Sequence, residues 1–167
     1  MNITEAKQQF IQSWGVFGSN WGINRTMAQI HALLLVAPDA MNADEIMEEL
    51  QISRGNVNMN IRDLMNWGIV EKVLKPGERK EFFVAEKDIW KVAMRIMKER
   101  KKRELDPIIQ AMEQIKDVED KKDAETKAFL ATVNQIQKFA KQADGALAGL
   151  IKADENWFTG TLLKMFK

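Results

Sequence analysis

The sequence predicts a mainly α-helical protein with one small β-hairpin. Apolar residues recur at helical spacing along most of its 167 residues, which indicates amphipathic helices. Two runs rich in valine, isoleucine and phenylalanine, at 69–74 and 81–86, flank the turn signal Pro76-Gly77 and indicate the hairpin. Hydrophobic residues make up 46% of the chain, which is enough for a packed core.

Two helices are expected ahead of the hairpin region. Residues 3–17 follow a helical pattern, which Gly15, Gly18 and Gly22, with Ser19 and Asn20, are expected to break. Asn24 is the predicted N-cap of the next helix. That helix is expected to end before Pro38, because a residue that precedes proline avoids the helical conformation.

Residues 42–86 form the segment around which the chain is organised. Asn42 and Glu45 match a capping box at the start of a short helix, and Ser53 can cap a second helix after a tight turn. Gly68 marks the end of that second helix, since glycine adopts the left-handed conformation at low cost. The two strands of the hairpin follow. Helix, turn, helix and wing, in this order, predict a winged helix-turn-helix.

The second of these helices has one apolar and one polar face. Val57, Ile61 and Leu64 are expected in the core. The polar face and the hairpin tip provide the predicted DNA-contact set: Ser53, Arg54, Gly55, Asn56, Asn58, Met59, Arg62, Lys75, Arg79 and Lys80. A major groove admits one α-helix, on which arginine pairs with guanine and asparagine with adenine, while basic wing residues contact phosphates. An isolated polar face of this kind also fits a solvated surface, but the order of elements favours DNA binding.

Several motifs in this region resemble the GbsR-type branch of the MarR-like regulators. They are Trp21-Gly22-Ile23-Asn24-Arg25, the run from Ser53 to Met59, Trp67-Gly68-Ile69-Val70 and the run from Gly77 to Phe83. The resemblance implies a winged-helix homodimer that regulates transcription. Two DNA-reading helices in one dimer would read a pseudo-palindromic operator, and we expect the protein to act there as a repressor. Relatives of this name are associated with genes for osmoprotectant uptake and synthesis, so kinship suggests a small quaternary amine as effector.

Aromatic side chains are the candidate effector-binding residues. MarR-like dimers commonly carry effector sites between the winged domain and the dimerisation helices, and Trp14, Phe17, Trp21 and Trp90 come from these parts of the sequence. Aromatic faces attract quaternary ammonium groups. Each of the four also fits an ordinary place in the core.

The second half of the chain is predicted to be helical. We place a DNA-binding domain with its N-terminal helix at 1–88 and a helical dimerisation region at 89–167. Asp106-Pro107 is expected to restart a helix, and a loose break is expected at 143–149. These amphipathic helices cannot bury both faces alone, so a second subunit is expected to cover them. The basic run at 98–103 is either a solvated helix end or a flank that contacts phosphates.

Composition excludes several classes of protein. The chain has no cysteine, and its single histidine, His31, fits a core-edge or hydrogen-bonded role better than a metal ligand. No set of nucleophile and base, phosphate loop or dinucleotide motif is present, so we expect no enzyme, no cofactor and no metal site. The start of the chain lacks a signal sequence and no apolar run is long enough for a bilayer, so a cytoplasmic protein without membrane contact is expected.

Charge favours double-stranded DNA as the partner. The net charge of the chain is only +1, but the segment from Ser53 to Lys80 contains six basic and three acidic residues, a net charge of +3. The near-neutral total leaves an alternative, a winged-helix module that docks another protein without specific DNA binding. Such a docking face would show more exposed apolar or aromatic residues than this arginine and asparagine set.

Overall fold

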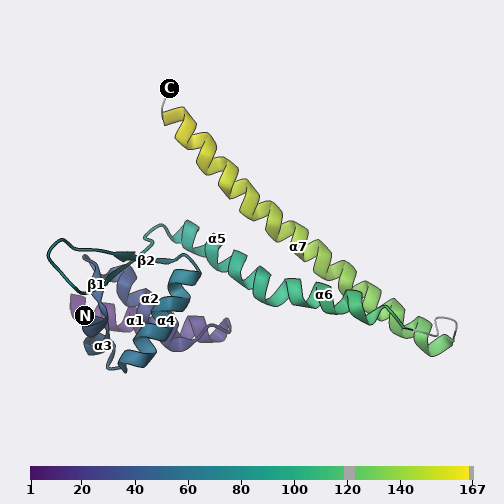
Figure 1. Cartoon of the computed structure of the whole chain (residues 1–167), viewed down its shortest axis with the longest axis horizontal. Coiled ribbons are helices and arrows are strands. Elements are labelled where there is room, and N and C mark those ends of the chain that lie inside the picture. Colours follow the sequence, from purple (N-terminus) through teal and green to yellow (C-terminus); the bar gives the residue numbers. More distant parts are fainter. Residues whose placement is uncertain (119–122, 166–167) are drawn as a thin grey trace. The chain divides into compact units, whose positions relative to one another are not determined.

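The computed structural model describes residues 1–118 and 123–165, with side chains through residue 153 (Figure 1). Two compact units are present, Met1–Arg95 and Ile96–Lys167. No helix in the described part of the chain has the length and apolar character needed to cross a membrane.

The first unit contains a bundle of helices and a three-stranded antiparallel sheet. Its elements are α1 (Ile3–Asn20), α2 (Arg25–Val36), β1 (Met41–Asn42), α3 (Ala43–Leu50), α4 (Arg54–Asn66), β2 (Val70–Val73) and β3 (Phe82–Ala85), followed by the start of α5 (Ile89–Arg100). The strand order is β1-β3-β2, with Met41 opposite Phe83 and Val73 opposite Phe82. The predicted winged helix-turn-helix is confirmed, and the short strand β1 is an addition to it.

The core of this unit lies between α2, α3, α4 and the sheet. Ile30, Leu34 and Ile46 are at most 1% exposed. The three residues predicted for the inner face of α4, which are Val57, Ile61 and Leu64, are also buried. Each such side chain contributes roughly 1.5–3 kcal/mol through the removal of apolar surface from water. This packing fixes which face of α4 points outward.

The glycines of α1 have a different role from the predicted one. The helix runs through Gly15 and Gly18 without interruption, so the expected break at these two residues is wrong. It ends at Asn20, and the break expected at Gly22 is confirmed by the φ of 74° there. A Cβ atom at Gly18 would lie 2.6 Å from the Cβ of Ala28, and one at Gly15 would lie 2.7 Å from the Cγ of Gln29. Residues three apart share a helix face, so the two glycines together allow α1 to pack closely on α2.

Helix α2 is capped at both ends by side chains. The side chain of Asn24 accepts the Met27 N–H at 3.1 Å, which confirms the predicted N-cap. At the other end, Lys87 Nζ donates to the carbonyl oxygens of Leu34, Leu35 and Ala37 at 2.7, 2.7 and 3.0 Å. A cation is favourable at this end of a helix, where backbone carbonyls have no helical partner.

The second unit is a pair of helices joined at one end (Figure 1). After α5, a π-helical segment, η1 (Lys101–Leu105), leads directly into α6 (Asp106–Ile115), where Pro107 lies in the first turn. The second helix of the pair, α7 (Ala124–Met165), is continuous, so the break expected at 143–149 is wrong. Gly145 and Gly149 have open space around them; glycine inside a helix costs only about 1 kcal/mol, which the long helix tolerates.

Candidate nucleic-acid interface

Three local features set the start and the end of α4. The turn before it is made by Gln51, whose φ of 53° is in the left-handed region. Ser53 then caps the helix, because its Oγ accepts the Asn56 N–H at 3.3 Å. The helix ends at Asn66, and Gly68, whose φ of 73° is in the left-handed region, allows the chain to turn into β2. The local signals for the start and the end of α4 are therefore confirmed.

The outward face of α4 carries the side chains predicted for base contact. All of the predicted residues on this helix are exposed: Arg54, Gly55, Asn56, Asn58, Met59 and Arg62. Asn60 differs from its neighbours, since it is 2% exposed and its Nδ2 donates to the Asn56 carbonyl oxygen at 2.8 Å. Its position three residues after Val57 and four before Leu64 places it on the inner face. Asn60 is accordingly absent from the predicted DNA-contact set.

The basic residues of the wing fall into two groups. Arg79 and Lys80 are exposed in the segment between β2 and β3. Lys75 is half-buried: its Nζ lies 4.0 Å from the centre of the Phe82 ring and donates to the Ala40 carbonyl oxygen at 3.3 Å. Lys75 therefore secures the base of the wing to the segment before β1.

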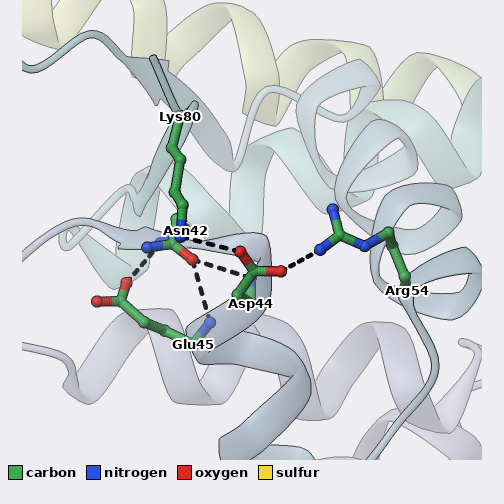
Figure 2. A network of polar contacts seen from close by, with 5 residues as sticks. All are labelled: Asn42, Asp44, Glu45, Arg54 and Lys80. Atoms are coloured by element: carbon green, nitrogen blue, oxygen red, sulfur yellow. Dashed lines mark hydrogen bonds and ion pairs between the residues drawn. The ribbon is translucent and has the colours of Figure 1, made fainter. Parts of the chain in front are cut away.

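A polar network joins α3, α4 and the wing (Figure 2). The capping box predicted for α3 is confirmed, with Asn42 accepting the Glu45 N–H at 3.1 Å and Glu45 accepting the Asn42 N–H at 2.7 Å. Next to it, the carboxylate of Asp44 pairs with the guanidinium of Arg54 and, at 3.1 Å, with Lys80 Nζ. The hydrogen bond from Lys80 and the charge of Arg54 lower the pKa of Asp44.

Asp44 is the member of this surface that sequence reasoning missed. It stands ten residues before Arg54 and 36 before Lys80. Neither separation matches the three or four residues that bring side chains together on one helix, so the sequence alone does not reveal these pairs. The folded chain brings the three side chains together around a recess of about 210 Å³. Asn58, a predicted base contact, also lines this recess.

Three of the four candidate effector residues form a row along α1. Ring centres are 5.5 Å apart between Phe10 and Trp14, 5.8 Å between Trp14 and Phe17, and 5.3 Å between Phe17 and Trp21. Phe17 and Trp21 are 50% and 54% exposed. The fourth candidate, Trp90, lies in the first turn of α5 with 57% of its surface exposed.

His31 is a core residue of α2. It is 2% exposed, its ring centre lies 6.3 Å from that of Trp14, and its Nε2 has no hydrogen-bond partner. Burial, with a smaller effect from the charge of Lys87, lowers its pKa to about 4, so the ring is neutral at physiological pH. Among the described residues, no group of three histidine, aspartate or glutamate side chains is placed to hold a metal ion.

Comparison with known proteins supports the family resemblance. No protein-family model matches the chain. The transcriptional repressor GbsR of Bacillus subtilis is 30% identical over 112 residues, which are 67% of this chain and 62% of that protein. The predicted resemblance is confirmed: the chain is similar in sequence to a MarR-like regulator and has a winged-helix fold. The transcriptional regulator MmpR5 of Mycobacterium tuberculosis is 25% identical over 76 residues, or 45% of this chain and 46% of that protein.

A solved structure shares the fold of this MarR-like chain over nearly its full length. It is a crystal structure of a transcriptional regulator with a TM-score of 0.68 and 14% identity, and the match covers 90% of this chain and 99% of that one. In sequence, the MarR-like chain spans less than two thirds of each of the two curated relatives, 62% of GbsR and 46% of MmpR5.

Proposed function

We propose that this MarR-like protein is a sequence-specific DNA-binding transcriptional regulator. The observation that carries the proposal is the outward face of α4, where Arg54, Asn56, Asn58 and Arg62 are exposed while the apolar side of the same helix is buried. Arginine and asparagine have the paired donors and acceptors that match guanine and adenine edges in the major groove. The two relatives described above, GbsR and MmpR5, are named as regulators of transcription.

The wing supplies the contacts that position this helix on DNA. Arg79 and Lys80 are exposed on the segment that links β2 to β3, and each can contact a phosphate beside the groove that α4 enters. Such contacts carry little sequence information but make binding dependent on salt. The base-reading and backbone-binding parts thus belong to separate elements of one unit.

The proposed active form is a homodimer. The second unit (Ile96–Lys167), which forms a helical arm, leaves large apolar side chains uncovered, with Phe129, Ile136 and Phe139 on α7 between 45% and 71% exposed. Val133 and Ala140, which lie next to Phe129 and Ile136 at helical spacing, are buried. A second copy would cover these exposed side chains. The two α4 helices of the dimer, about 34–36 Å apart, would then enter successive major grooves of a pseudo-palindromic site. We propose a repressor, as the name of GbsR describes that relative.

An effector would act on this dimer by changing the population of the form that binds DNA. The row of Trp14, Phe17 and Trp21 is the proposed contact surface for a small quaternary amine, because such cations bind over aromatic faces. Titration with choline and glycine betaine should change the tryptophan fluorescence and the melting temperature. Identical values with and without these amines would remove this part of the proposal.

The experiment that tests the function is a titration with random-sequence duplex DNA at two salt concentrations. We expect roughly micromolar binding that weakens steeply with salt, since phosphate contacts dominate non-specific complexes. Absence of binding at low salt would contradict the proposal and favour a protein-docking module.

A variant pair then separates base reading from phosphate contact. Arg62→Ala should weaken binding to a site selected from random DNA by about 1–3 kcal/mol and relax its sequence preference. Arg79→Ala should weaken binding to all sequences similarly and lower the salt slope by about one. Unchanged affinity in both variants would rule out the proposed orientation on DNA.

A further inference from the structure

Asp44 is an acidic side chain inside the surface that the proposed function assigns to DNA. It lies in the first turn of α3 and pairs with Arg54 at the start of α4 and with Lys80 in the wing (Figure 2). The side chains of Asp44, Arg54 and Lys80 are 44%, 62% and 57% exposed, so all three remain accessible to a ligand. A carboxylate in this position repels the phosphates that the two cations would attract.

The pairing leaves both cations with free donors. A guanidinium has five N–H donors and an ammonium has three, and Asp44 accepts one hydrogen bond from each partner. The carboxylate therefore holds the two side chains in place and cancels part of their charge, but it does not block them. The recess that the three residues line with Asn58 is open to a base edge or a phosphate.

We propose that Asp44 is a specificity-determining residue, which lowers affinity for DNA of any sequence while it holds Arg54 and Lys80 in position. This inference rests on the proposed function of α4 and the wing. Complexes with DNA of random sequence depend on phosphate contacts alone. The repulsion between the Asp44 carboxylate and the phosphates therefore lowers their affinity without any compensating base contact. A specific complex gains hydrogen bonds to base edges, and side chains that are already ordered lose less conformational freedom on binding.

The test compares Asp44→Asn with Glu49→Gln. The first change keeps the size of the side chain and removes its charge from the network. Glu49 is an exposed residue of the same helix, so its variant makes the same change in net charge outside the network. Each full-length protein is titrated with random-sequence duplex over a series of salt concentrations. The titration is repeated with a site selected from random DNA by the wild type.

Asp44→Asn should bind random duplex about three- to tenfold more tightly than the wild type at low salt. Its salt slope should be steeper by about one, the change expected for one more phosphate contact. Affinity for the selected site should rise less, so the ratio of specific to non-specific affinity should fall about threefold or more. Glu49→Gln should stay within about twofold of the wild type on both duplexes.

The outcomes separate this inference from the function on which it rests. If the wild type fails to bind random duplex, both proposals are overturned. If it binds but Asp44→Asn matches Glu49→Gln, or binds random DNA less tightly than the wild type, the role of Asp44 alone is overturned. Circular dichroism checks that each variant is folded, and Asp44→Ser replaces Asp44→Asn if the latter is unfolded.

A double-mutant cycle with Lys80→Gln tests whether Asp44 acts through its partner. Removal of Lys80 should reduce the gain that Asp44→Asn gives on random duplex, because one of the two released cations is then absent. An equal gain in both backgrounds would show that Asp44 acts independently of Lys80 and would contradict the proposed network.

Discussion

The winged unit and the helical arm cover their apolar surfaces to very different extents. In the winged unit, Ile30, Leu34, Ile46 and Leu64 are at most 1% exposed. In the described part of the arm, the buried apolar side chains are the smaller Val133 and Ala140, while residues as large as Phe139 face solvent. The winged unit therefore has a core of its own, whereas the described part of the arm leaves large apolar side chains exposed.

The largest expected effect comes from removing core volume in the winged unit. Leu64→Ala should lower the free energy of unfolding by about 2–5 kcal/mol, because the truncated side chain leaves a cavity among residues packed on all sides. Urea unfolding followed by tryptophan fluorescence measures it, since Trp14, Trp21, Trp67 and Trp90 report on this unit.

Phe139→Ala is the matched truncation in the arm. Because Phe139 is 71% exposed, its truncation should leave the free energy of unfolding of the winged unit unchanged. It should lower the affinity between the subunits of the proposed dimer, which sedimentation measures. A loss of stability as large as that of Leu64→Ala would show that Phe139 is packed in a core, and would contradict the contrast between the two units.

Acid should destabilise the winged unit through its buried histidine. The pKa of His31 is about 4 in the folded chain and about 6.5 when unfolded, so the unfolded state binds the proton first as pH falls. Stability is full above pH 6.5 and should fall by about 2 kcal/mol between pH 7 and pH 5 from this group. His31→Leu should remove that part of the pH dependence in urea titrations. A variant with the same pH dependence as the wild type would assign the acid sensitivity to other groups.

Glycine substitutions should have opposite signs in the two units. Gly18→Ala places a methyl group 2.6 Å from the Cβ of Ala28 and should cost about 1–3 kcal/mol, because two packed helices must separate. Gly145→Ala has open space around it and should stabilise α7 by up to about 1 kcal/mol. Thermal melts followed at 222 nm by circular dichroism, a standard helix signal, compare the two. Equal effects would show that close packing is not the function of Gly18.

The sequence predicts those features that depend on neighbouring residues. The caps at Asn24, Asn42 and Ser53 were predictable because each acts within three residues of its own position. The turn at Gly68 was predictable for a similar reason, since only glycine enters the left-handed region at low cost.

Features that depend on packing between distant segments were missed or misjudged. Gly15 and Gly18 have the composition of a helix break, and only the proximity of α2 shows that they are contact points. The strand β1 has two residues, too few for a pattern, and is defined by its pairing with β3. Asp44 and Lys80 are far apart in the sequence, and only the fold brings them together. The charge balance of the candidate interface could therefore not be predicted from the sequence.

The π-helical segment η1 sets the rotational phase of the helix that follows it. The Asp106 N–H bonds to the Lys101 carbonyl oxygen, five residues back, so this stretch holds one residue more than an ordinary helical turn allows. If the same residues instead continued as a regular α-helix, α6 would be rotated by about 100° about its axis. The set of α6 side chains that meets α7 would then change, and with it the apolar residues left outside. The wide turn at this one point thus decides which apolar surface of the arm stays exposed.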